Sequence, residues 1–208
     1  MSKTIKDQVY TSIFEDIIKG KYSSGEILKE KELIERFNVS KSPVREALVQ
    51  LCSEGVLISR PRFGYEIVRL TRRDIEDILK YRSILEGGAL NCSINNITAD
   101  QIDALSELDR KCCSQEAKDD FWIHWKYNVE FHLMLMSFYN NEFAYNNLKK
   151  AMDTLTRAYA QFYWDKWGNI SFPKDTKNHA DIIKSLRGKD IEKAVYFLRE
   201  DIGDFGIS

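Results

Sequence analysis

The stretch Val39–Cys52, VSKSPVREALVQLC, most constrains what this chain can fold into. Its apolar residues recur at positions i, i+3, i+4 and i+7, the spacing that gives a helix one buried face. These residues are Val44, Ala47, Leu48 and Leu51. Ser40 or Ser42 can cap the helix, and Pro43 is tolerated in its first turn, where a missing N–H costs nothing. The pattern predicts a helix packed on one side only.

The other side of this helix offers a cation and short hydroxyl donors in its first turn, where Lys41, Ser42 and Arg45 can point outward. Such a surface suits the major groove of DNA. Arginine pairs with guanine through two hydrogen bonds, while serine and lysine hold phosphates. The stretch therefore indicates a recognition helix.

The flanking segments favour a winged helix-turn-helix. Residues 5–18 and 29–37 have helical periodicity, and a turn of three or four residues at Asn38 leads into the recognition helix. Residues 56–58 and 65–68 look like two short strands joined at a tip. Arg62 at this tip could enter a minor groove, and Gly64 would let the backbone approach phosphates. The alternative is a solvated turn arginine.

Three motifs in this region resemble the GntR family of bacterial transcription regulators. Ser40–Leu48 is similar to the family signature VSRTPVREAL, with Leu28-x-Glu30-x-x-Leu33 upstream and Leu51-x-x-Glu54-Gly55 downstream. The resemblance spans residues 7–69 without a gap. It implies a DNA-binding regulator, and we expect the DNA-contacting residues to be Lys31, Ser40, Lys41, Ser42, Arg45, Arg62 and Gly64.

Composition agrees with a DNA-binding protein once charge is examined locally. The 208 residues carry a net charge of −1, but the segment 38–73 has seven basic and three acidic residues, a local charge of +4. No apolar run approaches the roughly 18 residues of a membrane span, and no signal peptide precedes Lys3, so we expect a cytoplasmic protein. The four cysteines lack metal-type spacing and are expected to be buried free thiols.

The remainder of the chain shows no strand signal and is mostly α. We expect three parts: a DNA-binding domain over residues 1–69, a linker over 70–74 and an all-α antiparallel helical bundle over 75–208. About six helices are predicted in the bundle. Five of them cover residues 75–92, 98–112, 119–139, 142–167 and 174–187, with a break at 168–173. Asp190 caps the last helix, which reaches at least to Ile202.

Two of the three histidines lie on inward helical faces. Asn128 and His132 are four residues apart, so both side chains can meet one point. His179 precedes an apolar stripe on a later helix. A histidine on such a face, taken alone, is more often a hydrogen-bonded core residue than a ligand, but helix bundles also build metal sites from side chains that converge in this way.

The order of short motifs in this region is similar to the FCD ligand-binding domain of the FadR-like branch of the GntR family. The motifs are Arg82-x-x-Leu85-Glu86, Phe131-His132, Asn141, His179-x-x-Ile182 and Lys189-Asp190-x-x-x-Ala194. In many members an aspartate, the histidine four residues later and two further histidines hold a divalent metal beneath a carboxylate effector. The resemblance therefore implies an effector-binding and dimerisation domain.

This chain departs from that pattern at two of the four metal positions. Asn128 stands at the aspartate position and Asp201 at the third histidine position, beside His132 and His179. Such a set could still bind zinc, nickel or manganese, because imidazole and carboxylate ligands suit these metals. The alternative is that metal was lost and the four groups bind each other or the effector directly. Arg82 could capture an effector carboxylate, or simply pair with Glu86.

The leading hypothesis is a homodimeric repressor that binds a pseudo-palindromic operator and is released by a small carboxylate effector. An enzyme with a metal-activated water at His132 and His179 is the first alternative. No paired carboxylates, nucleophile with a base or phosphate-binding glycine loop supports it, so we expect no catalytic activity. An effector-independent DNA-binding protein is the second alternative.

Overall fold

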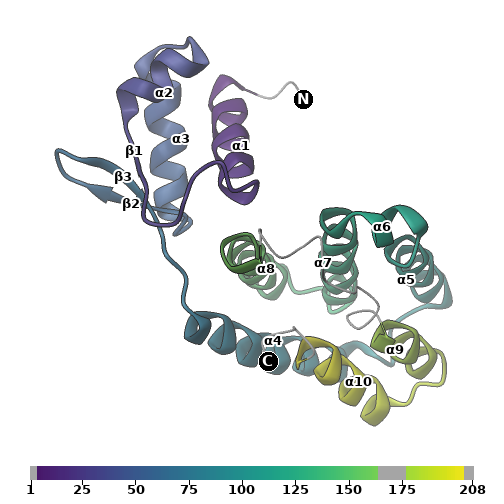
Figure 1. Cartoon of the computed structure of the whole chain (residues 1–208). Coiled ribbons are helices and arrows are strands. Elements are labelled where there is room, and N and C mark those ends of the chain that lie inside the picture. The colour runs from purple at the N-terminus through teal and green to yellow at the C-terminus, as the bar shows by residue number, and fades with distance from the viewer. Residues whose placement is uncertain (1–3, 164–176, 204–208) are drawn as a thin grey trace. The chain divides into compact units, whose positions relative to one another are not determined.

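The structure is a computed structural model that describes residues 4–163 and 177–203 (Figure 1). The chain divides into two compact units. The first contains the chain up to Ile75 together with the part of α8 from Asp153 onward, and the second contains the other described residues. The sequence did not predict that one helix, α8, contributes residues to both units.

The first unit is built on three helices around one apolar core. They are α1 (Ile5–Ile18), α2 (Glu30–Phe37) and α3 (Lys41–Ser53). A capping box formed by Thr4 and Asp7 starts α1 at the expected residue. The core is formed mainly by Val9, Ile13, Leu33, Val44, Ala47, Leu48 and Leu51.

The turn between α2 and α3 depends on Asn38, which adopts a left-handed conformation with φ of 50°. Asparagine tolerates this region better than most residues, because its short polar side chain bonds locally. Ser40 occupies the N-cap position of α3 as predicted, but its hydroxyl makes no capping hydrogen bond. Helix α3 therefore begins at an exposed serine whose hydroxyl is available to another partner.

The sheet beside these helices has three strands, where the sequence predicted two. β2 (Leu57–Arg60) and β3 (Gly64–Ile67) form the expected antiparallel hairpin, and β1 (Ile27–Leu28) pairs with the other edge of β3. The prediction missed β1 because two residues are too short to show alternation. The sheet order is β1-β3-β2, so the hairpin is anchored to the chain that enters α2.

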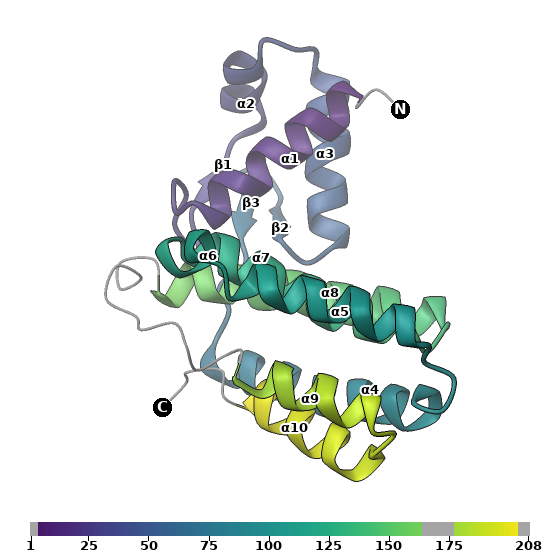
Figure 2. The ribbon, with the colours of Figure 1, turned by 90° about the vertical axis from the view of Figure 1, so that its right-hand side faces the viewer.

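The second unit is all-helical. Besides the first part of α8 (Glu142–Tyr163), its helices are α4 (Arg72–Ser93), α5 (Ala99–Cys112), α6 (Gln115–Asp119), α7 (Phe121–Ser137), α9 (Lys177–Arg187) and α10 (Ile191–Gly203). Figures 1 and 2 both show α9 and α10 lying side by side. Phe131, Ile182, Ala194 and Leu198 lie in its apolar core. No helix among the described residues has both the length and the apolar character needed to cross a membrane.

Several helix boundaries differ from the predicted ones. α4 begins at Arg72, inside the expected linker, because Thr71 and Asp74 form reciprocal hydrogen bonds that cap it. The short α6 is additional, so the described part of the chain has seven helices from α4 onward, where six were expected. The expected break at 168–173 lies outside the described residues. Of the cysteines, Cys112 is buried, whereas Cys92 is exposed despite its predicted inward position.

A buried carboxylate ties the first unit together and gives it a pH-dependent stability. Asp16 on α1 is buried and pairs with Lys21 and Arg36. Burial raises the pKa of Asp16, but the bonds from Lys21 and Arg36 outweigh it and hold this pKa below its ordinary value. The Asp16 carboxylate therefore stabilises the fold above its unfolded-state pKa, and that stability is lost as pH falls through the lower folded-state pKa.

We expect Asp16→Asn to lower the free energy of unfolding at pH 7 by about 1–3 kcal/mol, because two charge-assisted hydrogen bonds are lost. Urea unfolding of the full chain at pH 7 and at progressively lower pH measures the effect. The difference from the wild type must shrink on acidification. Glu15→Gln on the same helix, at an exposed pair with Lys19, is the matched control and should change stability little. Equal effects of both variants would contradict this prediction.

Candidate functional site

The exposed face of α3 carries the groups that the sequence assigned to DNA contact. Lys41, Ser42 and Arg45 are exposed, while the opposite face of the helix is buried in the core. The Ser42 hydroxyl donates a hydrogen bond to Glu46 Oε1 at 2.8 Å. Lys31 on α2 is also exposed, near Glu35 at 3.8 Å. The fold thus presents cations and hydroxyls from two neighbouring helices to solvent.

A hollow on this face adds residues that the sequence analysis missed. It runs along α3 from Ser42 to Ser53 and includes Lys6 from the first turn of α1. Val49 in the hollow is exposed, an unusual position for a large apolar side chain. The only sequence signal for Lys6 was its charge near a helix start. The hollow brings cations, an amide and an apolar side chain together, and each of these can contact a base edge.

The hairpin tip places Arg62 in solvent with a left-handed φ of 69°. Gly64 has a structural role besides the predicted approach to phosphates. Its φ is 128°, and a Cβ there would lie 2.5 Å from the carbonyl oxygen of Leu28. The pairing of β3 with β1 therefore demands glycine at this position.

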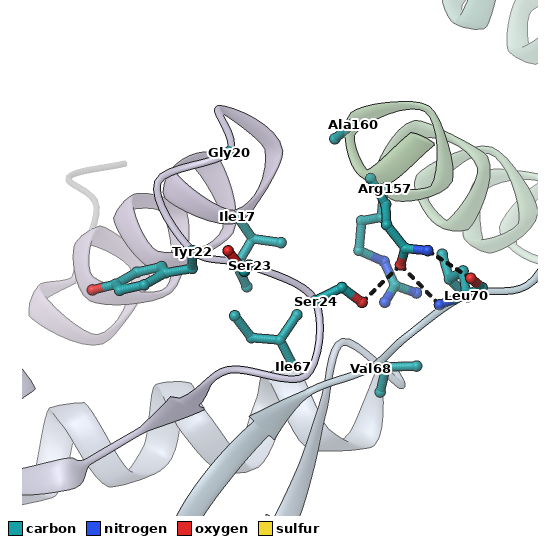
Figure 3. A pocket seen from close by; sticks show the side chains of 11 residues that line it. Ile17, Gly20, Tyr22, Ser23, Ser24, Ile67, Val68, Leu70, Arg157 and Ala160 are labelled. Carbon is teal, nitrogen blue, oxygen red and sulfur yellow. Dashed lines mark hydrogen bonds between the residues drawn. The ribbon is translucent and has the colours of Figure 1, made fainter. Parts of the chain in front are cut away.

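The first unit also contains a cavity of about 290 Å³ (Figure 3). A closed set of polar contacts lies at one side of it. Gln161 Oε1 accepts from the Leu70 N–H and from the Ser24 hydroxyl, both at 2.9 Å, while Gln161 Nε2 donates to the Leu70 carbonyl. Arg157 Nη1 donates to the Gly55 carbonyl at 2.9 Å. These bonds fix the end of α8 to the chain on both sides of the β2–β3 hairpin.

In the second unit, side chains from three helices converge on one buried point. His132 on α7, His179 on α9 and Asp201 on α10 each offer a ligand atom, and these atoms lie within 4.8 Å of one another. His132 Nε2 lies 3.0 Å from Asp201 Oδ2, and His179 Nε2 lies 3.7 Å from Asp201 Oδ1. All three residues are buried. Three of the four residues expected at this site are therefore brought together.

Each histidine has a second carboxylate at its other ring nitrogen. His132 Nδ1 lies 2.6 Å from Glu86 Oε2 on α4, and His179 Nδ1 lies 3.2 Å from Asp109 Oδ1 on α5. The His179 ring also stacks on Phe131 with ring centroids 3.7 Å apart. These contacts fix both rings with Nε2 facing Asp201. Sequence analysis did not single out Asp109, because its contact with His179 depends on how α5 packs against α9.

Arg82 on α4 is 1% exposed and its Nε donates to Glu86 Oε1 at 2.7 Å. The ion pair with Glu86 that the sequence offered as an alternative therefore forms, but in the interior of the unit. Nη2 of Arg82 has no hydrogen-bond partner in the described part of the chain. Glu86 links Arg82 to His132, so a row of alternating charges runs from α4 to α10.

The fourth expected residue, Asn128, is buried on α7 one turn before His132. His124 lies one further turn back and is also buried. His124 Nδ1 lies 3.2 Å from the carbonyl oxygen of Cys112. Sequence analysis did not single out His124, although it precedes Asn128 by the same four-residue step.

The environments of two histidines shift their pKa values in opposite directions. Burial lowers the pKa of His132, but the carboxylates of Glu86 and Asp201 outweigh burial and the Arg82 charge, so its pKa is raised. Burial lowers the pKa of His124, and the partly compensating contact with Cys112 does not restore it. The carboxylate of Glu86 has a lowered pKa; burial opposes this, and the charges of Arg82 and His132 prevail.

The donor set satisfies one structural requirement for a divalent metal. His179 Nε2 and Asp201 Oδ1 are buried and have no hydrogen-bond partner among the described residues. Buried polar atoms without partners are rare, and a cation between them would satisfy both. Metal-bound histidines also commonly donate their second ring N–H to a carboxylate, as Glu86 and Asp109 permit here. These residues could therefore hold a metal.

Fold and site together define a class of protein: a winged-helix unit whose third helix has an exposed polar face, joined to a helical unit with a buried polar site. Family models agree with each part. Residues 5–67 match the model described as bacterial regulatory proteins, gntR family, and residues 77–204 match the FCD domain.

Relatives and a solved structure support the same assignment. The chain is 25% identical to the HTH-type transcriptional repressor RspR of Escherichia coli over 202 residues, 93% of this chain and 85% of that protein. It is 27% identical to the gluconate operon transcriptional repressor of Bacillus licheniformis over 199 residues, 90% and 78% respectively. The structure of E. coli McbR/YncC superposes with a TM-score of 0.80 at 22% identity, covering 97% of this chain and 95% of that one.

The chain therefore belongs to the GntR family of bacterial regulatory proteins, in the branch that carries an FCD domain. Its function is that of a DNA-binding transcription regulator.

The environments of His132 and His124 predict that their pKa values shift in opposite directions from the ordinary value. In chelator-treated protein, the His132 imidazolium should persist above the ordinary pKa of about 6.5, whereas His124 should stay neutral below it. His132 then stabilises the fold at low pH, and this contribution is lost as pH rises through its folded-state pKa. Neutral His124 destabilises the fold progressively as pH falls below its unfolded-state pKa. Ring-nitrogen NMR of the chain's three histidines measures both values.

Glu86→Gln should lower the pKa of His132 and leave the pKa of His124 unchanged. The reason is that the Glu86 carboxylate contacts the His132 ring, whereas the His124 ring contacts the Cys112 carbonyl. Asp100→Asn, at an exposed position on α5, is the control for a general loss of negative charge. An unchanged pKa of His132 in Glu86→Gln would refute the assigned cause.

Proposed function

We propose that this regulator is a homodimeric repressor that binds a pseudo-palindromic operator and releases it when a small organic acid binds the second unit. The observation that carries the DNA-binding part is the two-sided character of α3. Its apolar face is buried, while Lys41, Ser42 and Arg45 remain exposed on the other side. One winged helix covers few base pairs, so specificity favours two copies on related half-sites.

In this proposal, Arg45 pairs with a guanine and thereby selects the operator. Lys31, Ser40, Lys41 and Ser42 bind phosphates and fix the register of α3 in the major groove. Arg62 reaches the adjacent minor groove from the hairpin tip. Gly64 contributes indirectly, by holding the hairpin against β1.

We further propose that His132, His179 and Asp201 hold a divalent zinc, nickel or manganese ion. The side-chain oxygen of Asn128 is the fourth donor. Two buried atoms without hydrogen-bond partners, His179 Nε2 and Asp201 Oδ1, support this assignment. A bound metal would supply a Lewis-acidic centre for an effector carboxylate. Glu86 and Asp109 orient the two histidine rings. The mixed donor set suits imidazole-binding metals better than calcium or magnesium.

The proposal that the effector is a carboxylate rests on a buried positive charge in the second unit. Arg82 has one guanidinium nitrogen without a partner in the described structure, and a carboxylate is the natural acceptor for it. The similarity to gluconate operon repressors, whose name refers to an organic acid, supports the same class. We place the effector contacts at Arg82, Asn128, His132, His179 and Asp201.

Regulation requires the effector to bind more tightly to the form of the protein that does not bind DNA. The site senses the effector and leaves it chemically unchanged. Glu86 and Asp109 each contact a different histidine and orient its ring, which favours sensing over a metal-dependent hydrolytic enzyme. A regulator of this kind acts on chromosomal DNA, so we place it in the cytoplasm.

Arg45→Ala should abolish operator discrimination while leaving the fold intact. The probe is the duplex most enriched by the wild-type chain from a random-sequence pool, compared with a scrambled duplex of the same composition. We expect the affinity ratio to fall by about 5- to 150-fold, the effect of about 1–3 kcal/mol for one bidentate base contact. Arg110→Ala, at an exposed arginine on α5, is the matched control. Sequence preference that survives Arg45→Ala would show that α3 is not the recognition helix.

Elemental analysis of the purified, tag-free protein should find nearly one divalent metal per chain, removable by chelator. His179→Ala should lose this metal, because it removes one of the three converging ligands. His124→Gln removes a buried histidine outside the converging group and should retain it. A panel of small organic acids should raise the melting temperature of the metal-loaded form more than that of the chelated form. Absence of metal in the wild type would contradict the metal proposal and leave Asn128 and Asp201 as direct effector contacts.

A further inference from the structure

An acidic residue lies among the cations that face DNA. Glu30 opens α2, and its carboxylate reaches across to the first turn of α3. Lys41 Nζ lies 3.2 Å from Glu30 Oε1, and Arg45 Nε lies 3.4 Å from Glu30 Oε2. The Glu30 side chain is 20% exposed, whereas those of Lys41 and Arg45 are 63% and 60% exposed. One largely buried carboxylate therefore pairs with two exposed cations on the surface proposed to contact DNA.

We propose that Glu30 is a specificity-determining residue: it holds Lys41 and Arg45 in place and penalises their binding to phosphates of any sequence. This inference rests on the proposed role of Arg45 in selecting the operator. The same geometry makes Glu30 a positioning residue, because it acts on DNA through the two cations.

Lys41 and Arg45 can exchange their ion pairs with Glu30 for contacts with DNA. Ion pairs whose cations are exposed contribute little to stability, so DNA can displace the cations from Glu30. The carboxylate itself cannot move far, because it is mostly buried at the start of α2. A phosphate that binds Lys41 or Arg45 must then lie near a fixed negative charge. This repulsion applies at every sequence.

A guanine in the operator avoids most of this repulsion. Its N7 and O6 atoms are neutral acceptors that pair with the Arg45 guanidinium, so the arginine can remain close to Glu30. Arg45 contacts Glu30 through Nε, which leaves both terminal nitrogens of the guanidinium available for a base. Glu30 therefore lowers non-specific affinity more than operator affinity.

Two acidic neighbours provide matched controls. Glu32 and Glu35 lie on α2 with Glu30, but they pair with Lys29 and Lys31 near their own positions in the chain. Their side chains are 64% and 66% exposed. Replacing either by glutamine makes the same change in net charge as Glu30→Gln without releasing Lys41 or Arg45.

The experiment measures binding of full-length wild type, Glu30→Gln, Glu30→Asp and Glu32→Gln to two duplexes. One is the duplex most enriched by the wild type from a random-sequence pool, and the other is its scrambled counterpart. Fluorescence anisotropy at low and high salt gives both affinities for each protein. Circular dichroism establishes that each variant is folded, and Glu30→Asp supplies a second variant that retains the charge.

We expect Glu30→Gln to bind the scrambled duplex about fivefold more tightly while its affinity for the enriched duplex changes less. The ratio of the two affinities should then fall by a similar factor, and the change should shrink at high salt because charge repulsion is screened. Glu32→Gln should leave the ratio unchanged, and Glu30→Asp should stay near the wild type.

Equal ratios for Glu30→Gln and Glu32→Gln would overturn the inference, since net charge alone would then explain any effect. A ratio that falls equally in Glu30→Asp would overturn it as well, by showing that shape and not charge matters. If the wild type enriches no sequence from the pool, the proposed operator-binding function itself fails. Failure of operator binding and failure of the Glu30 inference are distinguishable, because the selection with the wild type is completed before any variant is measured.

Discussion

The packing of one face of α3 is the constraint on which the DNA-binding unit depends. Val44, Ala47, Leu48 and Leu51 are all completely buried, so the helix cannot rotate about its axis without exposing apolar surface. Fixing the buried face also fixes the opposite face, where Lys41 and Arg45 project. In the proposed function, recognition of DNA therefore depends on packing inside the first unit that makes no contact with DNA.

In the second unit the corresponding constraint is polar. Arg82, Glu86, His132 and Asp201 form a continuous row of buried charged or titratable groups. Removing such groups from water is costly unless each finds a partner, and breaking one contact leaves the next group unpaired. A site of this kind is sensitive to small changes at any of its members. That sensitivity suits a domain that must change state when a ligand binds.

Most of the fold was predictable from local signals, and the exceptions have physical reasons. Helical periodicity and capping residues located α1 to within a residue, since both signals lie inside one short segment. Strand β1 was missed because its pairing with β3 is long-range and involves only two residues. The convergence of His132, His179 and Asp201 agrees with the expected set, but Asp109 was invisible to periodicity. Its role depends on how α5 packs against α9, which no local pattern encodes.

The exchange of ligand types at the buried site has a structural consequence. Relative to the pattern that the FCD resemblance implies, the carboxylate has moved from α7, where Asn128 now stands, to α10, where Asp201 stands. Asp201 contacts His132 of α7 and His179 of α9 simultaneously, so α10, and not α7 itself, carries this negative charge. Because α9 and α10 are packed together, the position of this helix pair is coupled electrostatically to α7. A ligand that competes with Asp201 for either histidine would weaken that coupling, and the C-terminal helices are therefore where a change of state in the second unit should begin.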